Sequence, residues 1–247
     1  MLHHYKNKKA FTLAEVLITL GIIGVVAAMT LPALISLYQK KIVETRLEQT
    51  YSIIAQALKM AEADYGDSQY WMRDSAGPQD DMIGVVYRFV STYLEPYIKS
   101  AKPDVISAPG YLYKYGYSVK TIPNTPTAIS SGTIVIQLNN GVILFVSYYH
   151  GRQGMASIRL IADVNGPKLP NVVGRDIYEM LFSLYDGILF MAGERQVTGY
   201  GISYDKIIKY DDILKRCKNG DVLGITECGA LIKQNGWKIP KDYPYRT

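Results

Sequence analysis

The sequence predicts an α+β protein in which a long N-terminal helix, half of it transmembrane, packs on an antiparallel β-sheet head. Three patterns predict this architecture. Residues 11–38 form an apolar run that contains a single charge, Glu15. Apolar residues at helical spacing continue to about residue 66, and strand-like segments with tight turns follow residue 132. A helical segment followed by a run of strands is typical of α+β domains.

The composition excludes two broad classes of protein. Of 247 residues, 48% are apolar and 20% are charged, which excludes an intrinsically disordered chain and a collagen-like one. The net charge is +5, but Lys6, Lys8 and Lys9 of the first ten residues supply +3 of it. The remainder holds 24 basic and 22 acidic side chains, a balance that argues against a nucleic-acid-binding groove.

The apolar run is long enough to cross a bilayer. Basic residues precede it, so the N-terminus is expected in the cytoplasm and the rest of the chain outside. The run is too long for a secretory signal, and a single-pass anchor is the default interpretation. Glu15 does not fit that default, because a carboxylate costs about 2.5–3.5 kcal/mol at the centre of a membrane helix. No partner for it lies nearby in the chain as written. A cut before Phe11 would supply one, since the new α-amino group could neutralise the Glu15 of a neighbouring copy.

The segment KAFTLAEVLITLGIIGVVAAMTLPALI resembles the N-terminus of type IV prepilins and type II secretion pseudopilins. In that family a prepilin peptidase removes a basic leader before a Phe, and the new amine is methylated. The resemblance implies cleavage between Ala10 and Phe11 and N-methylation of Phe11, although the family usually has Gly where this chain has Ala10. It also implies that Glu15, Gly24 and Pro32 serve filament assembly, and that Glu15 pairs with the Phe11 amine of an adjacent subunit.

The same resemblance implies the partners and the location of the chain. The partners are the prepilin peptidase, other pilin or pseudopilin subunits, the inner-membrane assembly platform and the inner membrane itself. The protein is then a single-pass protein of the inner membrane, with its head in the periplasm or outside the cell, before it enters a filament. It is a structural subunit and not an enzyme.

Four regions follow from these patterns. Residues 1–10 are the leader, 11–38 the transmembrane or filament-core helix, 39–66 the soluble half of that helix, and 67–247 the globular head with a C-terminal disulfide loop. One helix of about 50 residues ending near Gly66 accounts for the second and third regions. Its apolar stripe recurs at spacings of three and four and is expected to contact the head: Leu47, Tyr51, Ile54, Leu58, Ala61 and Tyr65.

Within the head we expect a loop over 66–79 and a helix over 80–95 that Pro96 ends. Segments rich in Pro and Gly continue through Pro126. Strands are expected over 133–138 and 142–149, joined by a tight turn at Asn139-Asn140-Gly141. Further strands are expected over 157–163 and 177–185, and 187–191 would extend the last of them.

The loop that begins at Asp163 could bind a metal. Asp163, Asn165 and a further Asp176 offer hard oxygen ligands on a turn shaped by Gly166, which suits calcium. The alternative is a turn in which these side chains bond their own backbone. We favour the turn and keep calcium as the alternative, and the sequence indicates no other cofactor.

Cys217 and Cys228 lie eleven residues apart, and no Cys or His nearby completes a metal site. If the head lies outside the cytoplasm, a disulfide is favoured over two buried thiols. A disulfide of this kind pins the C-terminal tail in some pilins, and Trp237 in that tail is expected to be buried against the sheet.

Two further features have alternative explanations. Tyr111, Tyr113, Tyr115 and Tyr117 alternate as in a strand, and a half-buried sheet face is favoured over a ligand surface. His150 is the one imidazole outside the leader, and no catalytic motif accompanies it. The alternatives to a filament subunit are therefore a non-polymerising, membrane-anchored extracytoplasmic binding protein and, with less support, a tethered hydrolase that uses His150.

Overall fold

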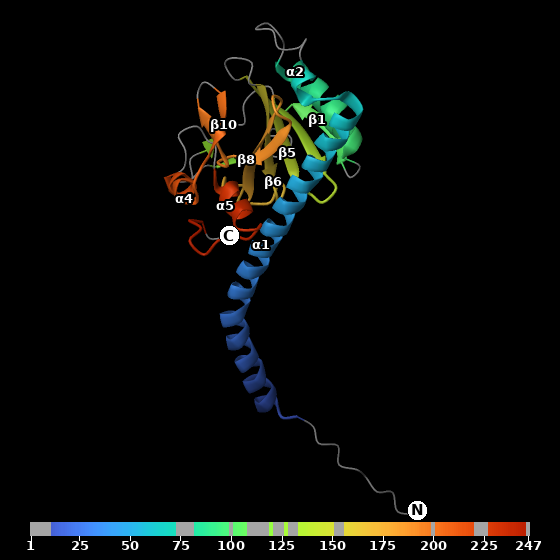
Figure 1. The fold of residues 1–247 in the computed structure, drawn as a ribbon. Coiled ribbons are helices and arrows are strands. Elements are labelled where there is room, and N and C mark those ends of the chain that lie inside the picture. The colour runs from blue at the N-terminus through green and yellow to red at the C-terminus, as the bar shows by residue number, and fades with distance from the viewer. Residues whose placement is uncertain are drawn as a thin grey trace, which may run out of the picture. The chain divides into compact units, whose positions relative to one another are not determined.

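The computed structural model describes residues 11–72, 82–98, 101–107, 119–120, 126–127, 133–150, 156–198, 201–219 and 227–245. The first element is one helix, α1 (Leu13–Tyr65), drawn from blue to cyan in Figure 1. This confirms the expected single helix of about 50 residues. Gly66 ends it in a left-handed conformation (φ +78°), with its N–H bonded to the carbonyl of Glu62 at 2.9 Å.

The chain forms two compact units, Met1–Lys41 and Ile42–Thr247. The first contains the apolar part of α1, which is long and apolar enough to cross a membrane. The second is the head, and it includes the remaining part of α1.

The head is built on a six-stranded antiparallel sheet with the strand order β1-β4-β5-β6-β7-β8. Its strands are β1 (Ala101–Ser107), β4 (Thr133–Leu138), β5 (Ile143–His150), β6 (Ala156–Asp163), β7 (Ile177–Ser183) and β8 (Ile188–Met191). Two short ribbons accompany it, β9 (Arg195–Thr198) with β10 (Gly201–Ile207), and β2 (Val119–Lys120) with β3 (Pro126–Thr127). An α+β head with a long N-terminal helix is the predicted fold class.

In the parts of the chain that the structure describes, short helical segments precede and follow these strands. The expected helix over 80–95 is α2 (Met82–Phe89), continued by a π-helical turn η2 (Val90–Leu94) and a 3₁₀ turn η3 (Glu95–Tyr97). The helix loses its regular form before Pro96, because proline has no N–H for the ladder. The others are η1 (Ser68–Tyr70), α4 (Tyr210–Asn219) and α5 (Cys228–Gln234).

One prediction about the strands is wrong. Residues 187–191 do not extend the preceding strand, because the chain turns at Gly187 (φ +66°) and β8 runs back along β7, pairing Met180 with Met191. No element was predicted for the Pro- and Gly-rich stretch, and β1 lies there and pairs with β4. The local sequence pattern does not predict β1, because this edge strand is stabilised by its pairing with β4 more than by the strand propensity of its own residues. The elements β9, β10, α4 and α5 were not expected either.

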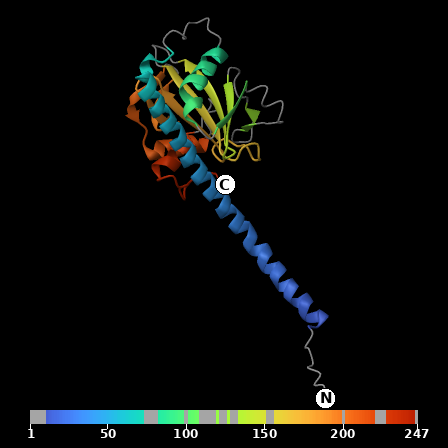
Figure 2. The same cartoon turned by 90° about the vertical axis from the view of Figure 1, so that its right-hand side faces the viewer.

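Side chains of successive strand residues point to opposite faces of the sheet, and the two faces bury different clusters. One face carries residues such as Leu144, Leu160 and Phe182, which share a core cluster with α1 and α2. Figure 2 shows the head part of α1 and α2 over the same face of the sheet. The opposite face has a smaller cluster around Phe145 and Ile177. The expected stripe of α1 is confirmed at Leu47, Ile54, Leu58 and Ala61, which are buried, whereas Tyr51 is partly buried and Tyr65 is exposed.

Candidate functional site

The first turn of α1 contains a reciprocal pair of hydrogen bonds between Thr12 and Glu15. The N–H and the hydroxyl of Thr12 both donate to Oε2 of Glu15 at 2.8 Å, and the N–H of Glu15 donates to the Thr12 hydroxyl at 3.3 Å. This is a capping box, in which side chains satisfy N–H groups that a helix leaves unpaired. The expectation that Glu15 has no partner nearby is therefore wrong. The pattern Thr-x-x-Glu before an apolar run was the signal in the sequence.

The helix beyond this cap presents exposed apolar side chains. Every large apolar side chain from Phe11 to Tyr38 is at least 43% exposed. Such a surface requires a bilayer or other apolar helices as its surroundings. Gly24 lies in this part with no atom within 4 Å of where a Cβ would stand, and α1 runs through Pro32 without interruption.

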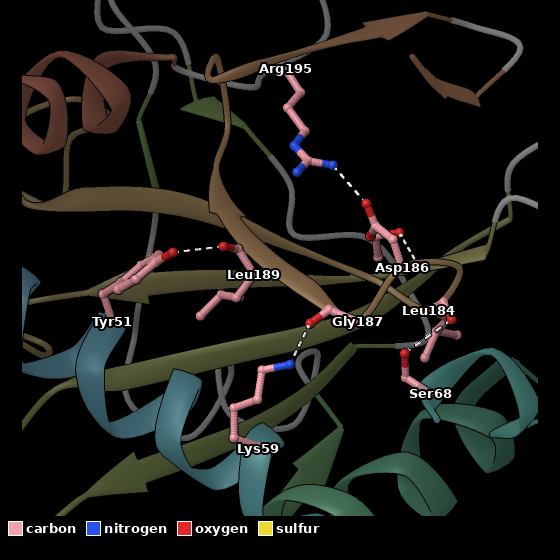
Figure 3. A network of polar contacts seen from close by, with 9 residues as sticks. Tyr51, Lys59, Ser68, Leu184, Asp186, Gly187, Leu189 and Arg195 are labelled. Carbon is pink, nitrogen blue, oxygen red and sulfur yellow. Dashed lines mark hydrogen bonds and ion pairs between the residues drawn. The ribbon is translucent and has the colours of Figure 1, made fainter. Parts of the chain in front are cut away.

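Polar side chains of the helical layer bond the β7–β8 hairpin (Figure 3). Tyr51 donates to the carbonyl of Leu189 at 2.6 Å, and Lys59 donates to that of Gly187 at 3.4 Å. Ser68 of η1 donates to the carbonyl of Leu184 at 3.1 Å. Because β8 is an edge strand, the bond from Tyr51 covers a carbonyl of that edge, and the other two bonds hold the turn that precedes it.

The C-terminal tail is fastened to the same helix. The buried carboxylate of Glu44 accepts the N–H of Ile239 at 3.0 Å. Lys233 donates to the hydroxyl of Tyr51 and to a carboxylate oxygen of Glu194, both at 2.8 Å. The ring of Trp237 lies 5.1 Å from that of Tyr51 on α1, and this tryptophan is partly buried against the main core cluster, to which both α1 and the sheet contribute.

A disulfide links Cys217 of α4 to Cys228 at the start of α5, as predicted. Tyrosines at the end of the chain pack beside it. Tyr245 donates to the carbonyl of Cys217, and Tyr243 donates to that of Gly174 at 2.6 Å. Burial raises the pKa of Tyr243 well above its ordinary value, so its hydroxyl stays protonated and remains a donor.

The loop between β6 and β7 is organised around Asp176. Its carboxylate accepts the N–H groups of Asn171 and Val172 at 2.9 and 2.6 Å, and the side-chain amide of Asn165 at 2.9 Å. Asp163 in turn accepts the N–H of Asn165 at 3.2 Å. These oxygens hold the turn together by side-chain-to-backbone bonds, the arrangement we favoured. Among the described residues, no group of three or more His, Cys, Asp or Glu side chains is placed to hold a metal ion.

Several predicted residues lie outside what the structure describes. Ala10 and the row Tyr111–Tyr117 are among them. For His150 the structure describes the backbone alone, which pairs with Ala156 between β5 and β6.

Two family models match the chain. The model of the prokaryotic N-terminal methylation motif matches residues 5–31, and the model of a family of unknown function, DUF6613, matches residues 33–247. No curated protein and no solved structure matches the chain. The methylation motif is that of structural pilin-type subunits and not of an enzyme family, and in this chain it lies on the exposed apolar part of α1. The chain is thus a subunit of the type IV pilin and pseudopilin kind and belongs, through most of its length, to the DUF6613 family.

Proposed function

We propose that the protein is a structural subunit of a type IV pilus-like filament or of a type II secretion pseudopilus. The methylation motif on an exposed apolar helix is the observation that carries this proposal. In the filament, apolar helices of many copies bury one another, and the α+β heads lie outside. Burial of the helix faces against one another replaces their contact with lipid. Left open to water outside the bilayer, these faces would cost about 25 cal/mol for each Å² of apolar surface.

Assembly starts with processing at the membrane. Prepilin peptidase cuts between Ala10 and Phe11 on the cytoplasmic side of the inner membrane, and the Phe11 amine is methylated. The head lies in the periplasm or outside the cell, where a disulfide such as Cys217–Cys228 persists. Residues 1–10 are the leader, 11–38 the filament-core helix, 39–66 its soluble half, and 67–247 the head. Gly24 and Pro32 lie at helix–helix contacts of the core.

Glu15 has two candidate roles, and a pair of substitutions separates them. Its carboxylate accepts both donors of Thr12 within the chain, and in the filament it neutralises the Phe11 amine of an adjacent subunit. Glu15→Gln keeps an oxygen for the Thr12 cap, since Gln also serves in a capping box, but removes the charge. Glu15→Ala removes both. We expect both variants to enter the membrane and neither to form filaments. Normal filaments from Glu15→Gln would show that capping, and not pairing with an amine, is what Glu15 contributes.

The mass of the N-terminal peptide, measured on protein from its native membranes, tests the processing step. A peptide that begins at methylated Phe11 is expected. An intact leader would contradict the proposal and favour an anchored extracytoplasmic binding protein that does not polymerise. Filament type is tested by deleting the gene and measuring, separately, surface pili and secreted proteins.

For the loop at Asp163, we propose a structural role without calcium. Three donors already occupy the carboxylate of Asp176. A bound ion at a hundred times its dissociation constant would stabilise the head by about 2.7 kcal/mol. We therefore expect the melting temperature to be the same in millimolar calcium and in chelator, and a clear rise with calcium would overturn this assignment.

A further inference from the structure

One end of the head has an exposed basic surface with a leucine at its tip. We call this surface the basic end and define it by Lys168, Leu169, Lys238 and Lys241. Leu169 is 77% exposed, Lys168 and Lys241 are exposed, and the side chain of Lys238 is 52% exposed. A single exposed leucine is ordinary on a protein surface. Leu169 and the lysines together can make two kinds of contact: the leucine can enter an apolar phase, and the lysines can bind anions.

Contacts bring the β6–β7 loop to the part of α1 with which the head begins. Arg46 donates to the carbonyl of Val164 at 2.9 Å, four residues before Lys168. At the same end, a Cβ on Gly166 would lie 2.5 Å from the carbonyl oxygen of Gly141 in the β4–β5 turn.

The C-terminal tail contacts both the start of the head part of α1 and the β6–β7 loop. Lys238 lies 3.5 Å from the carboxylate of Glu44, and Tyr243 bonds the carbonyl of Gly174 in the β6–β7 loop. Lys241 lies between these two attachments in the sequence. The basic end therefore comes from two separate segments, the β6–β7 loop and the C-terminal tail, and both contact α1 within a few residues of Ile42, where the head begins.

The acidic groups nearest the β6–β7 loop are withdrawn from the surface. Glu44, Asp163 and Asp176 are buried. Asp242 is exposed and accepts the hydroxyl of Tyr210 at 2.8 Å, Asp211 is exposed beside the same tyrosine, and Glu48 is exposed on α1. The loop that carries Leu169 thus buries its own carboxylates and exposes Lys168.

We propose that the basic end binds anionic phospholipid headgroups while the chain is anchored in the membrane, with Leu169 inserted at the interface. Ile42 directly follows Lys41, so the residues of α1 that contact the two segments of the basic end, Glu44 and Arg46, are only a few residues along the chain from the apolar run, and Lys40 and Lys41 add charge in the sequence between them. A lysine near an anionic surface favours the bound state about fivefold, so three favour it up to about a hundredfold. The proposal rests on membrane anchoring and not on filament assembly.

The test uses the full chain in nanodiscs that hold one copy each, which excludes contacts between subunits. One set of discs contains phosphatidylcholine alone, and the other contains about a quarter phosphatidylglycerol. Hydrogen exchange is measured for the amides of Lys168 and Leu169. We expect exchange to be slowed on the order of tenfold in the anionic discs, less than the hundredfold limit because Lys238 is shared with Glu44. The effect should fall in molar salt, which screens charge beyond about 3 Å.

A matched pair of double variants identifies the surface. K168E/K241E reverses two charges of the basic end and should abolish the slowing. R88E/K218E makes the same change in net charge at exposed positions of α2 and α4, and should retain it. All four positions are exposed, so we expect both variants to melt at the temperature of the unchanged protein. Equal exchange in the two kinds of disc would overturn the proposal, as would equal loss in both variants. Slowing that appears only in discs with two or more copies would also overturn it and would identify a second copy as the partner.

Discussion

Glu44 connects the C-terminal tail to the helix that anchors the chain, and its removal should loosen that connection. The carboxylate is 5% exposed and accepts the buried N–H of Ile239 at 3.0 Å. It also lies 3.5 Å from Lys238, whose side chain is 52% exposed. Glu44→Ala leaves the Ile239 N–H without its acceptor.

The magnitude follows from these two contacts. A hydrogen bond to a charged group contributes about 1.5–3 kcal/mol, whereas an ion pair with a half-exposed lysine contributes about 0–1 kcal/mol. We therefore expect Glu44→Ala to lower the free energy of unfolding of the head by about 2–3 kcal/mol. At about 2–4 °C for each kcal/mol, the melting temperature should fall by roughly 4–12 °C. Glu44→Gln keeps the acceptor and should cost about 1 kcal/mol or less.

Thermal unfolding of the full chain in detergent, followed by the near-ultraviolet signal of Trp237 and the tyrosines, measures this loss. Glu48→Ala is the matched control, because Glu48 is an exposed carboxylate one turn further along the same helix. It should change the free energy by no more than about 0.5 kcal/mol. If Glu44→Ala and Glu48→Ala melt at the same temperature, the reasoning from the buried hydrogen bond is wrong.

Three further predictions address the cap, the disulfide and a tyrosine. Thr12→Val removes both hydroxyl bonds of the cap, so the first turn of α1 should lose about 1 kcal/mol, seen as faster amide exchange there, with Thr12→Ser as the control. Replacing Cys217 and Cys228 together by Ser should cost on the order of 2–3 kcal/mol in thermal unfolding; an unchanged melting temperature would contradict this. Burial and the Asp242 carboxylate raise the pKa of Tyr210 from 10.0 to about 12, so stability from this contact is present below pH 10 and lost as the pH rises to 12. Asp242→Asn should lower that pKa and flatten the alkaline loss of stability, and an unchanged pH profile would argue against the contact.

Long periodic elements could be predicted from the sequence. The apolar run and the stripe from Leu47 to Ala61 predict one helix, and α1 has the expected length because every residue of it contributes to the same period. The β4–β5 hairpin also follows from local chemistry, since Gly141 adopts the positive φ (+86°) that its turn requires. The disulfide was predicted from the expected export of the head and not from the geometry of the cysteines.

Other features escaped because their signals are short or distant. The Thr12–Glu15 cap depends on only four residues. The cost of a carboxylate in lipid predicts a charged partner for Glu15, whereas its partner in the structure is the hydrogen-bonding Thr12 of the same turn. Nothing local showed that residues 187–191 turn back, because the reversal depends on one glycine. Trp237 was expected against the sheet, and its contact with Tyr51 joins residues 186 positions apart.

The sequence by itself determined the membrane-length helix, the methylation motif and the α+β class, since each depends on residues adjacent in the chain or repeated at a short period. Only the tertiary structure decided that Glu44 holds Ile239, that Asp176 holds its loop, and that the C-terminal tail and the β6–β7 loop both contact the start of the head part of α1. Those arrangements depend on which segments the sheet and α1 bring together. Such contacts stabilise the fold by burying apolar surface and by pairing buried polar groups. Both depend on segments that are distant in the sequence, so a residue and its sequence neighbours do not determine them.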